Sequence, residues 1–339
     1  MVKNKRYMKT AEMALVMALG ILMHGVLPYY LGAAFNESVL SNIFVTIVLA
    51  IWINFIFSIL TSCHSGKFKE LHLSDPMNLF GIGTWVAASS ICGVLIVNHF
   101  PQLDFLPKII LFLNILLWLY FICHSIQAFL KICQNQMLLL KSSHGIFLLT
   151  TVSTQSIVVF LHYVFHGTPG FLLMTMMGIG LLFYLISAFL ILKRYMTIPW
   201  SVERDWKNTN CILHGALSIS GLAAILSDVV NDQLILFFWI FTIFIFLIIE
   251  SIEIFRIYRR IDSYGLKKGI FIYDVSQWSR VFTFAMFYTF TSYIHCSETL
   301  LTMIQSAVLQ FGIWVIVFLI LFEVLLIVEE HRKTIRMDR

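Results

Sequence analysis

Charged side chains are scarce in this chain: Asp, Glu, Lys and Arg together make up 12% of its 339 residues. Soluble globular domains carry about 25% of these residues, which cover their water-facing surface. Hydrophobic residues reach 59%, and Phe alone occurs 31 times. The apolar residues also fall in long runs, whereas a soluble core produces short periodic stripes. The sequence therefore excludes a soluble globular protein and predicts an integral membrane protein.

Cysteine motifs are missing as well. The six cysteines include no CxxC pair and show no metal-ligand spacing. Most of them lie inside apolar runs, where a thiol behaves as a small hydrophobe. The net charge of +5 does not indicate a nucleic-acid partner, because the basic residues lie in short loops between apolar runs. We therefore expect no disulfide framework, no metal site and no nucleic acid.

Ten apolar runs are candidates for membrane spans, since a helix needs roughly 20 apolar residues to cross the hydrocarbon. They cover residues 11–33, 39–62, 77–98, 105–130, 145–165, 170–192, 210–230, 234–257, 281–296 and 300–328. The first run exceeds the ~7–15 residues of a signal-peptide core, so it counts as a span. Helices are expected because backbone groups in lipid must be satisfied within their own segment. The predicted fold is a single all-α transmembrane domain over residues 1–339.

The positions of Lys and Arg predict the orientation of these spans. With a cytoplasmic N-terminus, 22 of the 23 basic residues lie in cytoplasmic segments, and only Lys108 lies outside. This is the asymmetry that membrane proteins show. Outside connections such as 166–169 and 231–233 are short, so consecutive spans form antiparallel hairpins. We expect five hairpins in the plasma membrane, with both termini in the cytoplasm.

Odd-numbered spans are more polar than even-numbered ones. Gly, Ala, Ser, Thr, Asn, Gln and His account for 42 of 103 residues in the odd spans and 27 of 126 in the even spans. Close packing is one explanation, because small residues and hydroxyls join helices in membranes. The other is that odd spans line a polar path while even spans face lipid. The regular alternation favours a central pathway.

Four stretches of the odd and even spans resemble a known family. They are FGIGTW at 80–85, TTVSTQSIVV at 150–159, MMGIGLLFY at 176–184 and FTFAMFYTFT at 282–291. In their order and placement they resemble the tellurite-resistance/dicarboxylate transporter family, which includes the slow-type anion channels. The resemblance implies five hairpins around a pseudo-five-fold central pore, a homotrimer, and a phenylalanine that occludes the pore. By position in the motif this gate is Phe284, with Phe287 as the second candidate.

The residue types of the odd spans favour anions as the transported partner. Their central portions contain no Lys, Arg, Asp or Glu, whereas cation-coupled transporters usually place a carboxylate at depth. Hydroxyl and amide groups and helix-end N–H groups can hold an anion in a neutral pore. The candidate pore-lining residues are Thr151, Thr154, Gln155, Ser218, Gly83, Thr84, His24 and His214. The sequence thus predicts a passive anion channel or facilitative anion transporter, which is not an enzyme and needs no cofactor.

Histidines keep two alternatives open. A proton-linked dicarboxylate carrier would use His24 or His214, both on odd spans. A haem- or metal-containing redox enzyme would use histidine ligands, and His162 and His166 have the i, i+4 spacing of a helical metal pair. The second alternative is less favoured, because these residues and His295 fall near the outer ends of their spans, and no second pair lies at matching depth.

Overall fold

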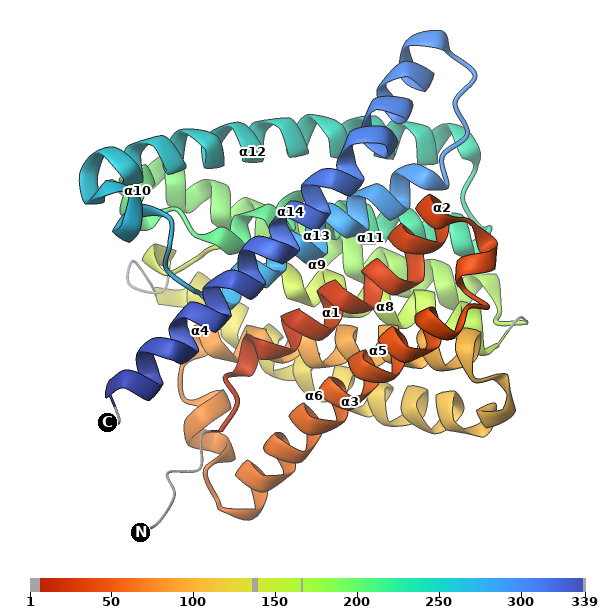
Figure 1. Ribbon diagram of the computed structural model, residues 1–339, viewed down its shortest axis with the longest axis horizontal. Coiled ribbons are helices and arrows are strands. Elements are labelled where there is room, and N and C mark those ends of the chain that lie inside the picture. Colours follow the sequence, from red (N-terminus) through yellow and green to blue (C-terminus); the bar gives the residue numbers. More distant parts are fainter. Residues whose placement is uncertain (1–6, 136–139, 166, 338–339) are drawn as a thin grey trace.

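The computed structural model describes residues 7–135, 140–165 and 167–337 (Figure 1). All regular structure in these residues is helical, as the sequence predicts. Five helices form an inner set: α1 (Ala14–Ile21), α5 (Gly83–His99), α8 (Leu149–Val164), α11 (Ile212–Ser227) and α13 (Trp278–Ser292). Five longer ones form an outer set: α3 (Val39–His64), α6 (Phe105–Asn135), α9 (Gly170–Thr197), α12 (Asp232–Gly269) and α14 (Thr299–Met337). Three short helices complete the described part: α2 (Leu27–Leu31), α4 (Pro76–Leu79) and α10 (Val202–Asp205).

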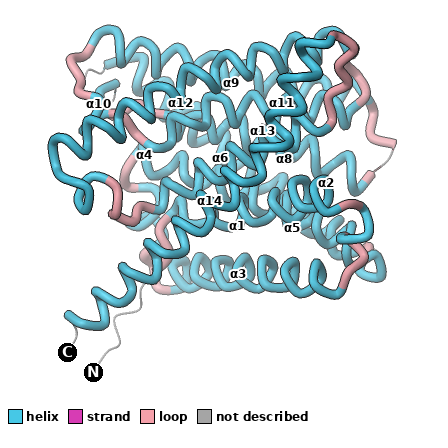
Figure 2. Tube along the Cα trace, turned by 45° about the horizontal axis from the view of Figure 1, so that its top comes forward, coloured by secondary structure: helices cyan, strands magenta, loops and turns pink. Residues whose placement is uncertain are grey.

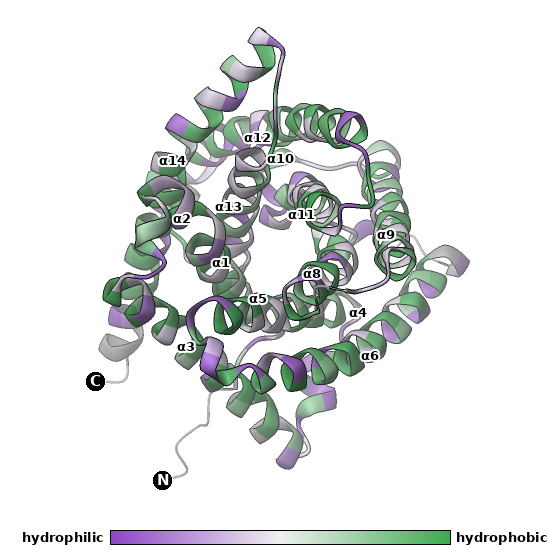
Figure 3. Ribbon diagram, turned by 90° about the vertical axis from the view of Figure 1, so that its right-hand side faces the viewer, coloured by the Kyte–Doolittle hydropathy of each residue, from purple (hydrophilic) through white to green (hydrophobic). Residues whose placement is uncertain are grey.

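The inner helices form a closed ring. α1 contacts α5, α5 contacts α8, α8 contacts α11, α11 contacts α13, and α13 returns to α1. The outer helices cover this ring: α3 packs on α1 and α5, α6 on α5 and α8, α9 on α8 and α11, α12 on α11, and α14 on α13. Figure 3 shows the ring end-on and Figure 2 shows the same helices in a tilted side view. Odd and even spans therefore separate into an inner and an outer layer.

The burial of the two layers matches a membrane environment. In the apolar windows of α5, α8 and α11, 78% to 89% of the residues are buried, and in the first span 50% are. The windows of the five outer helices are only 17% to 44% buried, although they are strongly apolar. An apolar surface of this extent is stable in contact with lipid and not with water.

The same local feature precedes every inner helix. A short 3₁₀ turn leads into each of them, at Thr10–Met13, Phe80–Ile82, Gly145–Leu148, Asn208–Cys211 and Val275–Gln277. The turns recur at intervals of one hairpin, so the five hairpins repeat a common local structure at the start of their first helix.

Close approach between inner helices depends on glycine. A Cβ atom on Gly93 of α5 would lie 2.0 Å from Cζ of Phe160 in α8, and one on Gly221 of α11 would lie 2.1 Å from Cζ of Phe290 in α13. Each ring therefore occupies the space of an absent side chain on the neighbouring helix. These contacts account for part of the small-residue content of the odd spans by packing.

Several helices differ from the predicted spans, and α6 and α9 run five residues past the predicted 130 and 192. α12 and α14 continue beyond 257 and 328 into more polar sequence, and α12 has a kink at Gly265, whose φ is 72°. α13 begins three residues before the predicted 281 and ends four before 296. Nine helical segments of the described chain are long and apolar enough to cross a membrane, and α13 is not one of them. At 1.5 Å per residue its 15 residues rise about 22 Å, less than the ~30 Å of the hydrocarbon.

The first span is also less regular than predicted. It changes to a wider π-helical turn at Leu22–Val26 before it continues as α2. Pro28 lacks the N–H group that would bond the carbonyl of His24, so the regular ladder is interrupted there. The turn thus sets the direction of the His24 side chain.

The starts of α8 and α11 meet at a backbone contact. The Gly145 N–H donates to the side-chain oxygen of Asn210 over 2.9 Å, and Nδ1 of His144 lies 2.7 Å from the Thr209 hydroxyl. A Cβ atom on Gly145 would lie 1.9 Å from the Thr209 carbonyl oxygen. That oxygen belongs to the main chain, so it cannot rotate away.

We expect Gly145→Ala to lower the free energy of unfolding by about 1–3 kcal/mol, because the first turns of α8 and α11 must separate. Thermal unfolding of the purified protein in detergent measures this change. Gly178→Ala is the matched control, since no atom lies within 4 Å of its Cβ position. Equal melting temperatures for the two variants would contradict the expectation.

Candidate functional site

A narrow cavity lies at the centre of the inner ring. Its volume is about 30 Å³, and residues from all five inner segments line it. A buried water needs about 10–15 Å³ of such space, so the cavity holds only a few atoms. Its wall is mostly aliphatic and methionine side chains, and His24, Ser90 and Ser156 are the polar residues that line it.

Helix α13 contributes Phe282 and Met286 to this wall. Residues four apart lie on the same face of a helix, so the two side chains point in one direction. Both are buried. An aromatic ring and a methionine side chain from the ninth predicted span therefore narrow the centre of the ring.

The two predicted gate residues lie on another face of α13. Phe284 packs edge-on against His214 and Phe246, with ring centroids 5.9 Å and 5.1 Å apart. Phe287 stacks on Phe246 at 4.9 Å. Because two residues along a helix turn the direction by about 200°, Phe284 points away from the side chain of Phe282. Neither Phe284 nor Phe287 is among the residues that line this cavity.

The predicted polar residues of α8 also point outward. Thr151 donates to the carbonyl of Gly180 in α9 over 3.0 Å, and the Gln155 amide donates to another carbonyl of α9 over 3.1 Å. Thr154 accepts a hydrogen bond of 3.0 Å from the indole of Trp118 in α6. These three residues join the inner helix to two outer helices, which is the packing role of such groups.

Four further candidates have contacts away from the cavity. Ser218 donates to the carbonyl of His214 in its own helix over 2.8 Å. Thr84 donates to a carbonyl of its own turn over 2.7 Å, and Gly83 allows close contact with α8. His214 is fully buried, with Nε2 3.4 Å from Oε1 of Glu250 in α12. The structure thus brings none of these four to the wall of the cavity.

His24 is the candidate that does line the cavity. The π-helical turn carries it, and its Nδ1 lies 3.3 Å from the amide nitrogen of Asn98 in α5. Its ring meets Tyr163 of α8 edge-on at 5.2 Å. Among the described residues that line the cavity, it is the one titratable side chain.

Sequence reasoning missed Ser90, Ser156 and Phe282. The Ser90 hydroxyl accepts a 2.9 Å hydrogen bond from Asn114 in α6, and Ser156 donates to a carbonyl of its own helix over 2.7 Å. Ser156 lies in the same polar run as Gln155, one residue further on. A helix turns about 100° per residue, so the run alone does not say which of its members faces inward.

The histidines form no metal centre within the described chain, since no group of three or more His, Cys, Asp or Glu side chains there is placed to hold an ion. His166, one half of the predicted i, i+4 pair, lies outside the described residues.

The comparison with protein families agrees with this architecture. The family model for voltage-dependent anion channels (SLAC1) matches residues 7–328, which is nearly the whole chain. The chain belongs to this family. No curated protein matches the sequence. The family match confirms the resemblance seen in the sequence, because the slow-type anion channels are its members. The chain is therefore a multi-pass membrane protein of an anion channel and transporter family.

We expect Thr154→Val to lower the free energy of unfolding by about 1–3 kcal/mol, because the buried indole N–H of Trp118 loses its acceptor. Thermal unfolding in detergent is the measurement. Thr175→Val is the control, since Thr175 is exposed on α9 and bonds only within its own helix. A loss of stability as large in the control would contradict a role for the Trp118 contact.

Proposed function

We propose that small inorganic or organic anions pass passively along the axis of the inner ring, and that Phe282 occludes this path. The observation that supports the proposal is the central cavity, to which every inner segment contributes and which Phe282 and Met286 narrow. About 30 Å³ leaves no room for a hydrated anion. The conformation described here is thus a closed one. In this proposal the occluding ring is Phe282, in place of Phe284 and Phe287.

The lining suits weak binding of an anion. The hydroxyls of Ser90 and Ser156 and the imidazole of His24 offer polar contacts in a wall that is otherwise apolar. Conduction requires binding that is weak enough for release, and apolar constrictions gate by excluding water. No Lys, Arg, Asp or Glu lies among the described lining residues, so the path itself is neutral.

We further propose that both termini are cytoplasmic and that the protein lies in the plasma membrane. The described ends of the chain lie at one end of the bundle, together with α4 and α10 (Figure 1). In the predicted topology 22 of the 23 basic residues belong to this side, where they would raise the local anion concentration. The homotrimer implied by the resemblance is part of the proposal, and the mass of the purified complex in detergent tests it.

The first test compares anion flux into proteoliposomes that contain wild-type protein or Phe282→Ala. We expect low flux in wild type and an increase of at least about tenfold in the variant, which corresponds to a barrier lower by about 1.4 kcal/mol. The reason is that removal of the ring widens the narrowest part of the cavity.

Phe284→Ala is the matched comparison, because its ring lies against α12. If anion flux increases in Phe284→Ala but not in Phe282→Ala, the occluding residue is Phe284, as predicted from the sequence. No flux in wild type, Phe282→Ala and Phe284→Ala would contradict the anion path itself.

A proton-linked dicarboxylate carrier is the second candidate. Of the two histidines that such a carrier could use, His24 lies on the cavity wall and His214 does not. Passive flow predicts that anion flux does not depend on a pH gradient across the vesicle membrane. The carrier predicts dicarboxylate uptake only with an inward proton gradient, and its loss in His24→Asn. Flux measured with and without the gradient separates the two.

A further inference from the structure

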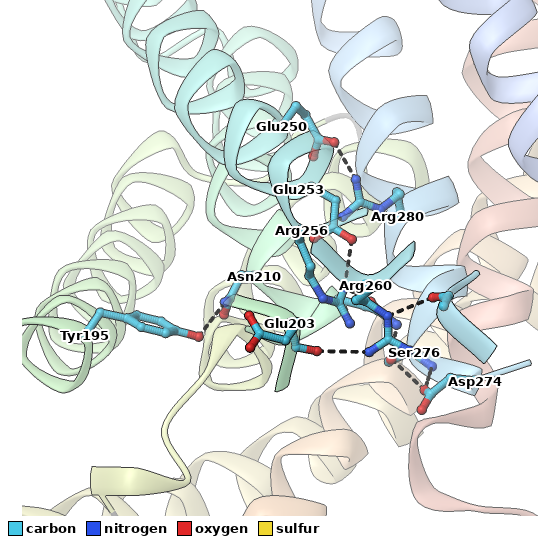
Figure 4. Close-up of polar contacts among 12 residues, drawn as sticks. Tyr195, Glu203, Asn210, Glu250, Glu253, Arg256, Arg260, Asp274, Ser276 and Arg280 are labelled. Atoms are coloured by element: carbon cyan, nitrogen blue, oxygen red, sulfur yellow. Dashed lines mark hydrogen bonds and ion pairs between the residues drawn. The ribbon is translucent and has the colours of Figure 1, made fainter. Parts of the chain in front are cut away.

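A cluster of charged side chains lies between α12 and the first turn of α13 (Figure 4). Arg280 forms ion pairs with both Glu250 and Glu253, the second at 3.2 Å. Arg256 forms an ion pair with Glu253 at 2.7 Å and donates to Asn208. The side chains of the four charged residues are at most 14% exposed. We call Arg256, Arg280, Glu250 and Glu253 the α12–α13 ion cluster.

The formal charges of this cluster balance. Two guanidinium groups face two carboxylates, so the formal charges cancel when His214 beside Glu250 is neutral. A buried ionised side chain is costly unless it is paired. The pairs therefore restrict Arg280 to positions near both carboxylates.

The part of α12 that carries Glu250 and Glu253 is held by contacts that do not involve α13. Arg256 on α12 is bonded to Asn208, in the 3₁₀ turn before α11, and Arg260 donates to the carbonyls of Gly269 and Glu203. These contacts hold the polar end of α12 against its surroundings. Arg280, which pairs with Glu250 and Glu253, is thus attached to a helix that these contacts keep in place.

The ion cluster and the cavity lie on opposite faces of α13. Arg280, Phe284 and Phe287 all contact residues of α12. Phe282 follows Arg280 by two residues, which is a turn of about 200°, and points to the cavity with Met286. Rotation of α13 about its own axis would therefore move Arg280 away from the carboxylates of α12 and Phe282 away from the cavity at the same time.

We propose that Arg280 is a positioning residue, whose ion pairs with Glu250 and Glu253 set the rotation of α13 and so hold Phe282 across the cavity. This inference rests on the proposed function. Arg280 lies in the first turn of α13, two residues before Phe282, so the ion pairs act on the part of the helix that bears the ring. Phe282 narrows the cavity only while the opposite face of the helix stays attached to α12.

The test is a double-mutant cycle of anion flux in proteoliposomes. Arg280→Gln alone should raise flux by about tenfold over wild type, since Phe282 is no longer held. In the Phe282→Ala background the same change should add nothing, because the ring through which Arg280 acts is gone. Arg280→Lys keeps the charge, and it should keep flux near the wild-type level. If Arg280→Gln does not fold, Glu250→Gln, which leaves Glu253 as a partner, takes its place in the cycle.

Arg259→Gln is the control, because it removes an exposed arginine from the same helix. Its flux should equal that of wild type. The proposal is overturned if Arg280→Gln leaves flux unchanged, if its effect adds to that of Phe282→Ala, or if Arg259→Gln raises flux equally. These results can be told apart from failure of the proposed function, because in that case the Phe282→Ala variant itself passes no anions.

Discussion

Close contact between neighbouring inner helices is the constraint on which the rest of this structure depends. Five helices close a ring only if each can approach two others, and at Gly93 and Gly221 the approach leaves no space for a Cβ atom. At these two positions a glycine therefore faces a phenylalanine of the neighbouring helix. The rings of Phe160 and Phe290 fill the spaces that these glycines leave. What remains at the centre is a cavity of about 30 Å³.

Polar groups on the inner helices follow from the same constraint. Helices in lipid gain little from hydrophobic association, so van der Waals packing and hydrogen bonds must join the two layers. Thr151, Thr154 and Gln155 provide such bonds from α8 to α6 and α9. The indole of Trp52 in α3 donates to Ser89 of α5 over 3.1 Å, and that of Trp239 in α12 donates to Thr291 of α13 over 3.0 Å. Many hydroxyls of the odd spans thus bond outward and leave the centre apolar.

The sequence predicts the layers but not the directions of single side chains. The all-helical fold and the separation of odd from even spans follow from composition and apolar length, which average over many residues. The cavity wall depends on helix rotation, where an error of one residue changes the direction by about 100°. Ser156 and Gln155 are neighbours, yet only Ser156 lines the cavity. For the same reason, FTFAMFYTFT does not distinguish Phe282 from Phe284.

The charged residues show how the helix that bears Phe282 is supported from outside the ring. Near its C-terminal end the rotation of α13 is specified by Phe290, which fills the space at Gly221, and by Thr291, which accepts a hydrogen bond from Trp239. In its first turn an arginine is paired with two carboxylates, and rotation would separate these buried opposite charges. In the proposed closed state, the ion pairs on the α12-facing side of α13 add to its specificity for one rotation, while the occlusion itself comes from an uncharged ring.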